Sequence, residues 1–227
     1  MNGKMITELN LKSIDEKTLM EKPQKVISIQ PEHGMISIII ETHDSHKSIE
    51  NEIFEKENSE LSRYLQETKW IDYGNIRNEI VDEIPEGNSL AVAESIVKYV
   101  KGKITYDNIL AEKISKGEIF GLCASEAIEK GKGTCGEYVN GVIALLRRKN
   151  IPAKYISGLY INNGKYTNHA WVEFWVDGKG WIPADIQIGS IGINHNHIKL
   201  YKGIDFDEIL PELCKFEIEI ISNKETD

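Results

Sequence analysis

Cysteine is scarce in this chain of 227 residues, which contains three. Their uneven spacing matches neither a disulfide framework nor the paired cysteines of a zinc site. We expect Cys123 and Cys214 to fill core positions, because free cysteine is among the most buried residue types. Cys135 is different, because it stands in a segment with a distinctive pattern.

Long apolar runs and an excess of positive charge are also missing. No stretch reaches the ~18 apolar residues of a membrane helix, and the N-terminal segment lacks the apolar core of a signal peptide. The net charge is −9, from 36 acidic and 27 basic residues, which argues against nucleic acid or an anionic membrane as the main partner. We therefore expect neither partner, and a cytoplasmic location, which suits free thiols.

The sequence contains no recognisable phosphate-binding or metal-binding motif. The glycines before Cys135 lack the Lys-Ser/Thr ending of a phosphate-binding loop. Two close pairs of histidines have no third ligand nearby, so we interpret them as solvated loop residues: His43 with His46, and His195 with His197. We expect no cofactor and no metal.

What the sequence does contain is a segment, 134–152, that predicts a helix beginning at a cysteine. Thr134 and Glu137 have the spacing of a capping box, in which each side chain satisfies a free backbone N–H at the helix start. Asn150 and Pro152 are typical of a helix end. Between them, apolar residues recur with the helical period and basic residues fill the last turn, where the helix dipole favours cations: Val139, Val142, Ile143 and Leu146 are apolar, and Arg147, Arg148 and Lys149 are basic.

A thiol at a helix start needs a base before it acts as a nucleophile at neutral pH. The helix dipole stabilises a thiolate by roughly 0.3–1 kcal/mol, which alone is not enough. His169 is the candidate base, and it lies in the segment 166–176, whose aromatic and β-branched residues predict a strand. A turn then leads into a second predicted strand, 181–186, so that the two form a hairpin.

The register of this hairpin decides whether His169 can reach Asp185. If residues 177–179 form the loop, Trp171 lies opposite Asp185, and His169 is diagonal to the carboxylate on the same face of the sheet. A two-residue loop would instead put His169 and Asp185 on opposite faces, unless a bulge corrects it. The residues alone leave this choice open.

Three motifs carry a resemblance to a known family: Gly-Lys-Gly-Thr-Cys at 131–135, His-Ala-Trp-Val-Glu at 169–173 and Gly-Trp-Ile-Pro-Ala-Asp at 180–185. From Tyr64 to Lys215 the chain resembles the transglutaminase-like superfamily of papain-related cysteine enzymes. The resemblance implies an α+β fold in which the cysteine helix packs on an antiparallel sheet. The catalytic triad of the family then falls on three residues, Cys135, His169 and Asp185.

The resemblance also implies a mechanism, in which the thiolate attacks a peptide or carboxamide carbonyl while His169 moves the proton and Asp185 orients the imidazole. The backbone N–H of Cys135 would hold the oxyanion with a second donor, for which Tyr106 is our candidate. Trp171 and Trp181, with Trp175 between them, either line a substrate groove or pack in the sheet. Taken one at a time, Cys135 also fits a buried small apolar residue, His169 a hydrogen-bonded core histidine, and Asp185 a cap at a strand end.

For the domain organisation we expect a small β-containing N-terminal appendage, residues 1–63, followed by the catalytic domain, 64–227. The predicted hairpin 25–29 with 35–40 belongs to the appendage, and 50–69 forms either a surface helix or strands. A helix capped by Asn88 or Ser89, a strand at 154–161 and a closing strand at 215–221 belong to the catalytic domain.

The function that we expect is hydrolysis of peptide or carboxamide bonds through a thioester, by a cysteine protease or amidase acting on a peptide or protein substrate. The first alternative is transfer of the acyl group to an amine co-substrate, as in a transglutaminase. The second is a peptide-binding module with the same fold and no activity. The short chain, without a recognisable calcium loop, favours hydrolysis over amine transfer.

Overall fold

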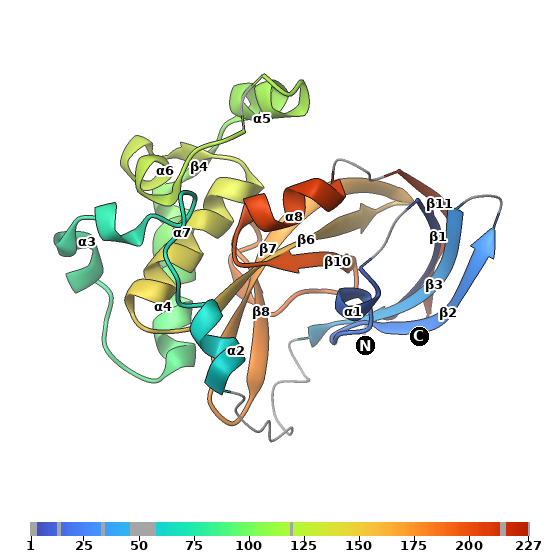
Figure 1. The fold of residues 1–227 in the computed structure, drawn as a ribbon, viewed down its shortest axis with the longest axis horizontal. Helices are drawn as coiled ribbons and strands as arrows, with labels where there is room; N and C mark the ends of the chain where they lie inside the picture. The colour runs from blue at the N-terminus through green and yellow to red at the C-terminus, as the bar shows by residue number, and fades with distance from the viewer. Residues whose placement is uncertain are drawn as a thin grey trace.

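The structure, a computed structural model, describes residues 4–12, 15–32, 35–45, 58–118, 120–213 and 217–226. Two antiparallel sheets and a group of helices make up most of the fold (Figure 1). The helices gather beside the larger sheet, and the smaller sheet lies at the opposite end of the molecule, near both chain ends (Figure 1). This arrangement confirms the predicted α+β class.

The larger sheet has five strands in the order β10-β6-β7-β8-β9, all antiparallel to their neighbours. They are β6 Ala153–Asn162, β7 Lys165–Val176, β8 Gly180–Asp185, β9 Ser190–Ile191 and β10 His197–Gly203. Val176 pairs with Gly180 across the β7–β8 turn, which is the register that a loop of residues 177–179 requires. His169 and Asp185 therefore lie on the same face of the sheet.

The helices, in chain order, are α1 Glu16–Leu19, α2 Asn58–Arg63, α3 Asn78–Asp82, α4 Ser89–Lys103, α5 Asn108–Ser115, α6 Ala124–Lys130, α7 Cys135–Arg148 and α8 Phe206–Leu213, with a 3₁₀ turn, η2, at Tyr73–Asn75. The Asn88 side chain caps α4, as predicted, by accepting the N–H of Ala91 at 3.0 Å. None of the helices in the described ranges is long and apolar enough to cross a membrane.

Helix α7 is the centre of the core. Every residue from Glu137 to Arg147 is buried, because α4 and α6 pack against one side of the helix and β6 and β7 against the other. The predicted apolar stripe is buried as expected, but the rest of the helix is buried with it. Cys135 and Gly136 remain half-buried at the start of α7, so the helix holds its first turn firmly while leaving the thiol near the surface.

Arg147 differs from the expectation that the basic residues of this helix interact mainly with its dipole. Its side chain is buried and donates hydrogen bonds to the carbonyls of Gln66, Ala153 and Ile204 at 2.6, 2.8 and 2.5 Å. Because these carbonyls belong to three separate segments, the guanidinium fastens the end of α7 to the surrounding chain.

The smaller sheet has the order β11-β1-β3-β2, with β1 Lys4–Leu11, β2 Lys25–Glu32, β3 Met35–His43 and β11 Ile218–Thr226. β2 and β3 confirm the predicted N-terminal hairpin. β11 was predicted to close the catalytic domain, but it pairs with β1 instead. This sheet therefore takes strands from both ends of the chain, and the division at residues 63 and 64 stays a prediction.

Candidate active site

The candidate nucleophile, Cys135, is the first residue of α7, and the predicted capping box is present. The Glu137 carboxylate accepts hydrogen bonds from the backbone N–H and the hydroxyl of Thr134, both at 2.6 Å. Its other oxygen accepts the backbone N–H of Leu122 at 2.9 Å. Glu137 thus fixes both the start of the helix and the loop beside it, and with them the position of the thiol.

His169, on β7, lies between the thiol and Asp185. Its Nε2 is 2.8 Å from Asp185 Oδ2, and its side chain is 11% exposed. The side chain of Cys135 is close enough to the ring to act on its pKa. Because Nε2 faces the carboxylate, Nδ1 is the ring nitrogen left for the sulfur. The structure therefore brings together the three residues of the predicted triad.

The charge on this histidine is favoured despite its burial. Burial lowers the pKa of His169, but the hydrogen bonds and charges of Asp185 and Cys135 outweigh that effect and raise the pKa to about 9. An imidazolium at neutral pH is the partner that a thiolate needs. The charged form of His169 is therefore the one that this site favours at neutral pH.

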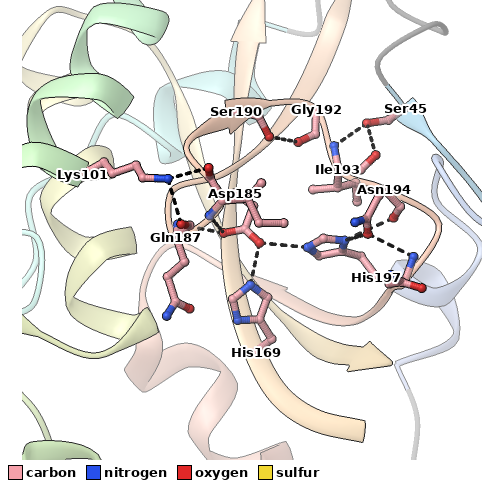
Figure 2. A network of polar contacts seen from close by, with 12 residues as sticks. Ser45, Lys101, His169, Asp185, Gln187, Ser190, Gly192, Ile193, Asn194 and His197 are labelled. Atoms are coloured by element: carbon pink, nitrogen blue, oxygen red, sulfur yellow. Dashed lines mark hydrogen bonds and ion pairs between the residues drawn. The ribbon is translucent and has the colours of Figure 1, made fainter. Parts of the chain in front are cut away.

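Asp185 is held by donors on both of its oxygens, as Figure 2 shows. Oδ1 accepts the backbone N–H groups of Gln187 at 2.9 Å and Ile188 at 3.4 Å. Oδ2 faces the Nε2 atoms of His169 at 2.8 Å and His197 at 3.0 Å. Burial raises the pKa of Asp185, but the hydrogen bonds of the two histidines outweigh it and lower the pKa, so the carboxylate stays ionised.

His197 was missed as part of this site. We interpreted it as a solvated loop residue, but it is buried at the start of β10 and bonded to Asp185. The error arose because β10 reaches the site through long-range pairing with β6, which no local pattern reveals. His195 is also bonded rather than merely solvated, with Nδ1 at 2.9 Å from Asp44 Oδ1.

The remaining histidines and cysteines do not join the site. His43 is exposed and lies 3.0 Å from Glu41, which agrees with a surface role. Cys123, at the start of α6, was predicted to be fully buried in the core, but it is only half-buried. His46 and Cys214 lie outside the described residues.

Tyr106 lies beside the start of the cysteine helix. The short strands β4 Thr105–Tyr106 and β5 Lys132–Gly133 pair so that Tyr106 is opposite Gly133, close to Cys135 in the chain. Burial raises the pKa of the Tyr106 hydroxyl, and the charge of a Cys135 thiolate raises it further. The role of this hydroxyl as an oxyanion donor stays a prediction.

Trp171 and Trp181 pack against neighbouring side chains. Trp171 is completely buried against Ile156 and Ile193, which is the packing alternative of our prediction. Trp181 lies near the turn end of β8, edge-on to Trp175 and under the ammonium of Lys154, which is 3.8 Å from the ring centre. A cavity of 270 Å³ near that turn includes Trp175 in its wall, at the end of β7 remote from His169.

The donor atoms of His169, Asp185 and His197 lie within 4.8 Å of one another, a grouping that could hold a metal ion. Both Nε2 atoms, however, already lie at hydrogen-bonding distance from the same carboxylate oxygen. This geometry matches a hydrogen-bonded chain of groups, in which the carboxylate takes a proton donor from each ring.

Comparison with known proteins agrees with this geometry. Residues 78–186, which contain all three triad positions, match the model of the transglutaminase-like superfamily. This region of the chain is similar to a transglutaminase-like core. A protein of Haemophilus influenzae is 24% identical over 188 residues, which are 72% of this chain and 48% of that protein. The chain thus spans about half the length of this curated relative.

Two solved structures share the fold of the transglutaminase-like chain. One is described as a putative cysteine protease from Cytophaga hutchinsonii, with 13% identity, a TM-score of 0.65, and coverage of 100% of this chain and 89% of that one. The other is the periplasmic domain of TgpA from Pseudomonas aeruginosa, with 15% identity, a TM-score of 0.51, and coverage of 80% and 70%. The expected fold, with a cysteine helix packed on an antiparallel sheet and a small β appendage, is confirmed.

Proposed function

We propose that this protein is a cysteine-dependent acyl-transfer enzyme that hydrolyses peptide or carboxamide bonds, with Cys135, His169 and Asp185 as its triad. The observation that supports this most is the position of His169, whose ring lies 2.8 Å from Asp185 and close enough to the Cys135 side chain for the cysteine to act on its pKa. In this arrangement the thiol, the base and the orienting carboxylate each have the neighbour that the chemistry needs.

The proposed reaction uses Cys135 as the nucleophile and the charged His169 as the proton donor. The Cys135 sulfur attacks the substrate carbonyl carbon, and the oxyanion that forms is held by the backbone N–H of Cys135 and the hydroxyl of Tyr106. His169, as an imidazolium, gives its proton to the departing amine, which leaves a thioester. Water then adds to the thioester, gives a proton to His169 and releases the acid and the thiolate.

Amine transfer differs from hydrolysis in the second half of the reaction, where an amine replaces water. A peptide containing glutamine, incubated with a labelled amine, distinguishes the two. Release of ammonia or of a cleaved peptide without incorporated label supports hydrolysis. Incorporation of the label would replace our proposal with a transglutaminase.

The thiol itself can be tested without knowledge of the substrate. We expect iodoacetamide at mildly acidic pH to label Cys135 faster than the half-buried Cys123, and the preference to disappear in His169→Ala. Labelling of Cys135 at the rate of a free cysteine would contradict an enzymatic role and favour a peptide-binding module. Cys123 serves as the internal control in the same chain.

A further inference from the structure

We propose that His197 is a positioning residue that holds Asp185 in the orientation in which it can act on His169. This inference rests on the proposed function, and it adds a fourth residue behind the triad. Figure 2 shows the arrangement, in which the two imidazoles approach one carboxylate oxygen from different sides. No described contact joins His197 to the sulfur; its hydrogen bond toward the triad goes to Asp185, and its ring centre lies 5.6 Å from that of His169.

The first observation is that His197 is fixed at both ring nitrogens. Nε2 lies 3.0 Å from Asp185 Oδ2, and Nδ1 lies 2.9 Å from the side-chain oxygen and 3.2 Å from the carbonyl of Asn194. Its side chain is 0% exposed. A buried ring that is held on two sides cannot rotate away from the carboxylate without breaking contacts that water cannot replace.

The second observation is that the loop carrying Asn194 is itself anchored. Ser45, beyond the end of β3, accepts the N–H of Ile193 at 2.7 Å and donates its own N–H to the carbonyl of Ile193 at 2.8 Å. Thr42 donates its hydroxyl to the carbonyl of His195 at 2.5 Å. The position of His197 is therefore supported from the smaller sheet, far along the chain from Asp185.

The third observation is that His169 and His197 share one oxygen of the Asp185 carboxylate. Oδ2 faces both rings, so the proton donated by His197 both restrains Asp185 and weakens its hold on His169. The groups that face these two rings from the packed elements are Cys135 on α7, Asp185 on β8 and Tyr160 on β6, whose ring centre is 5.9 Å from that of His169 and 5.0 Å from that of His197. Burial lowers the pKa of His197, and the hydrogen bonds to Asp185 and to the Asn194 carbonyl oppose that effect.

The experiment compares three substitutions of His197 in the full chain. His197→Gln keeps an N–H near the position of Nε2, His197→Asn keeps one near Nδ1, and His197→Leu removes both. His43→Gln is the matched control, because His43 is an exposed histidine on β3. Each variant is checked for folding by its thermal transition and then measured for turnover and for the alkylation rate of Cys135 as a function of pH.

We expect His197→Leu to lower kcat by about 10- to 100-fold, the usual effect of removing a group that orients a reactive side chain from behind, with KM unchanged. His197→Gln should recover most of this loss and His197→Asn little of it. The pH profile of alkylation should shift in His197→Leu and His197→Asn, and remain as in the wild type for His197→Gln and His43→Gln.

Two results would overturn the inference. Equal kcat and alkylation profiles in the wild type, His197→Asn and His197→Leu would show that Asp185 needs no second donor. Where His197→Leu does not fold, the same conclusion follows if His197→Asn equals or exceeds His197→Gln. A wild-type thiol with no enhanced reactivity would overturn the proposed function, and this inference with it, whereas a reactive wild-type thiol with unaffected variants overturns the inference alone.

Discussion

Two buried polar networks lie on the same pair of strands, and they differ in what they leave available. On β7 and β10, His169 and His197 meet at Asp185, while Glu173 and Lys199 form an ion pair at 2.9 Å. Both networks are buried and both involve charge. Burial and charge alone therefore do not distinguish a reactive centre from a structural one.

The two networks differ in whether a hydrogen-bonding position remains for a group outside the network. The Lys199 ammonium has three N–H donors, and it contacts Glu173, Glu21 and the carbonyl of Lys22 at 2.9, 3.3 and 2.8 Å. That network is closed, and it fastens the segment after α1 to the larger sheet. The histidine network is open at one point, the ring nitrogen of His169 that faces Cys135. We expect the reaction at this point, where the His169 ring, held by Asp185, faces the Cys135 thiol.

The largest expected effect comes from removing that one open group. His169→Ala should lower kcat/KM by at least about 10⁴-fold, or about 5 kcal/mol of transition-state stabilisation, as for other triads. The thermal transition should change much less, because the side chain lies at the edge of the core. Steady-state kinetics and a melting curve on the same preparation test both statements, and an active His169→Ala would remove the triad from consideration.

Lys199→Ala should produce the opposite pattern. It leaves Glu173 buried without its main partner, which costs about 3–5 kcal/mol of unfolding free energy, while alkylation of Cys135 in the folded fraction stays at the wild-type rate. Urea titration measures the loss. Lys12→Ala is the control, because Lys12 and Glu217 form an exposed pair at 2.7 Å, and we expect a change below about 1 kcal/mol. Loss of thiol reactivity in folded Lys199→Ala would mean that the two networks are coupled.

Tyr106→Phe tests a third group of the candidate active site, outside both polar networks. The substitution keeps the ring and removes the hydroxyl that we propose as an oxyanion donor. A lost oxyanion donor typically lowers kcat by about 10²- to 10³-fold, or about 2.7–4 kcal/mol. Burst kinetics with an activated ester locate the effect in formation of the thioester. Unchanged turnover would make Tyr106 a packing residue, the alternative that its partial burial also allows.

The parts of the fold that were predicted from the sequence are those with local signals. The capping box of Thr134 and Glu137 and the turn after Val176 depend on neighbouring residues, and both are present in the structure. The pairing of β11 with β1 joins the two ends of the chain. No local pattern specifies such a partner, which is why the sequence analysis did not predict this pairing.

The same distinction applies to the site. The positions of Cys135, His169 and Asp185 were predicted from the motifs, while the residues left two hairpin registers open; the structure has the one with residues 177–179 as the loop. His197 was missed and the choice between groove and packing for Trp171 stayed open, because both depend on β10 and its preceding loop: Trp171 contacts Ile193 of that loop, and His197 begins β10. Long-range packing decided which residue was buried and which was bonded to the carboxylate.

The smallest expected effect is the pH dependence of stability. The pKa of His169 is raised from 6.5 to about 9 in the folded chain, so the folded state binds this proton more tightly than the unfolded state does. The resulting stabilisation is fully present below the unfolded value and is lost as the pH rises through the folded one.

His169→Gln is the matched variant for this test, because its amide can still donate to Asp185 but does not titrate. In urea titrations across this pH window, the stability advantage of the wild type over His169→Gln should shrink by about 1.5–3 kcal/mol, the range for a hydrogen bond to a charged group. Lys199 and Glu173 are intact in both proteins, so the closed network cancels in the difference. If the two stability curves run parallel through the window, the imidazolium does not form in the folded state, and the proton that the leaving amine requires must come from another group.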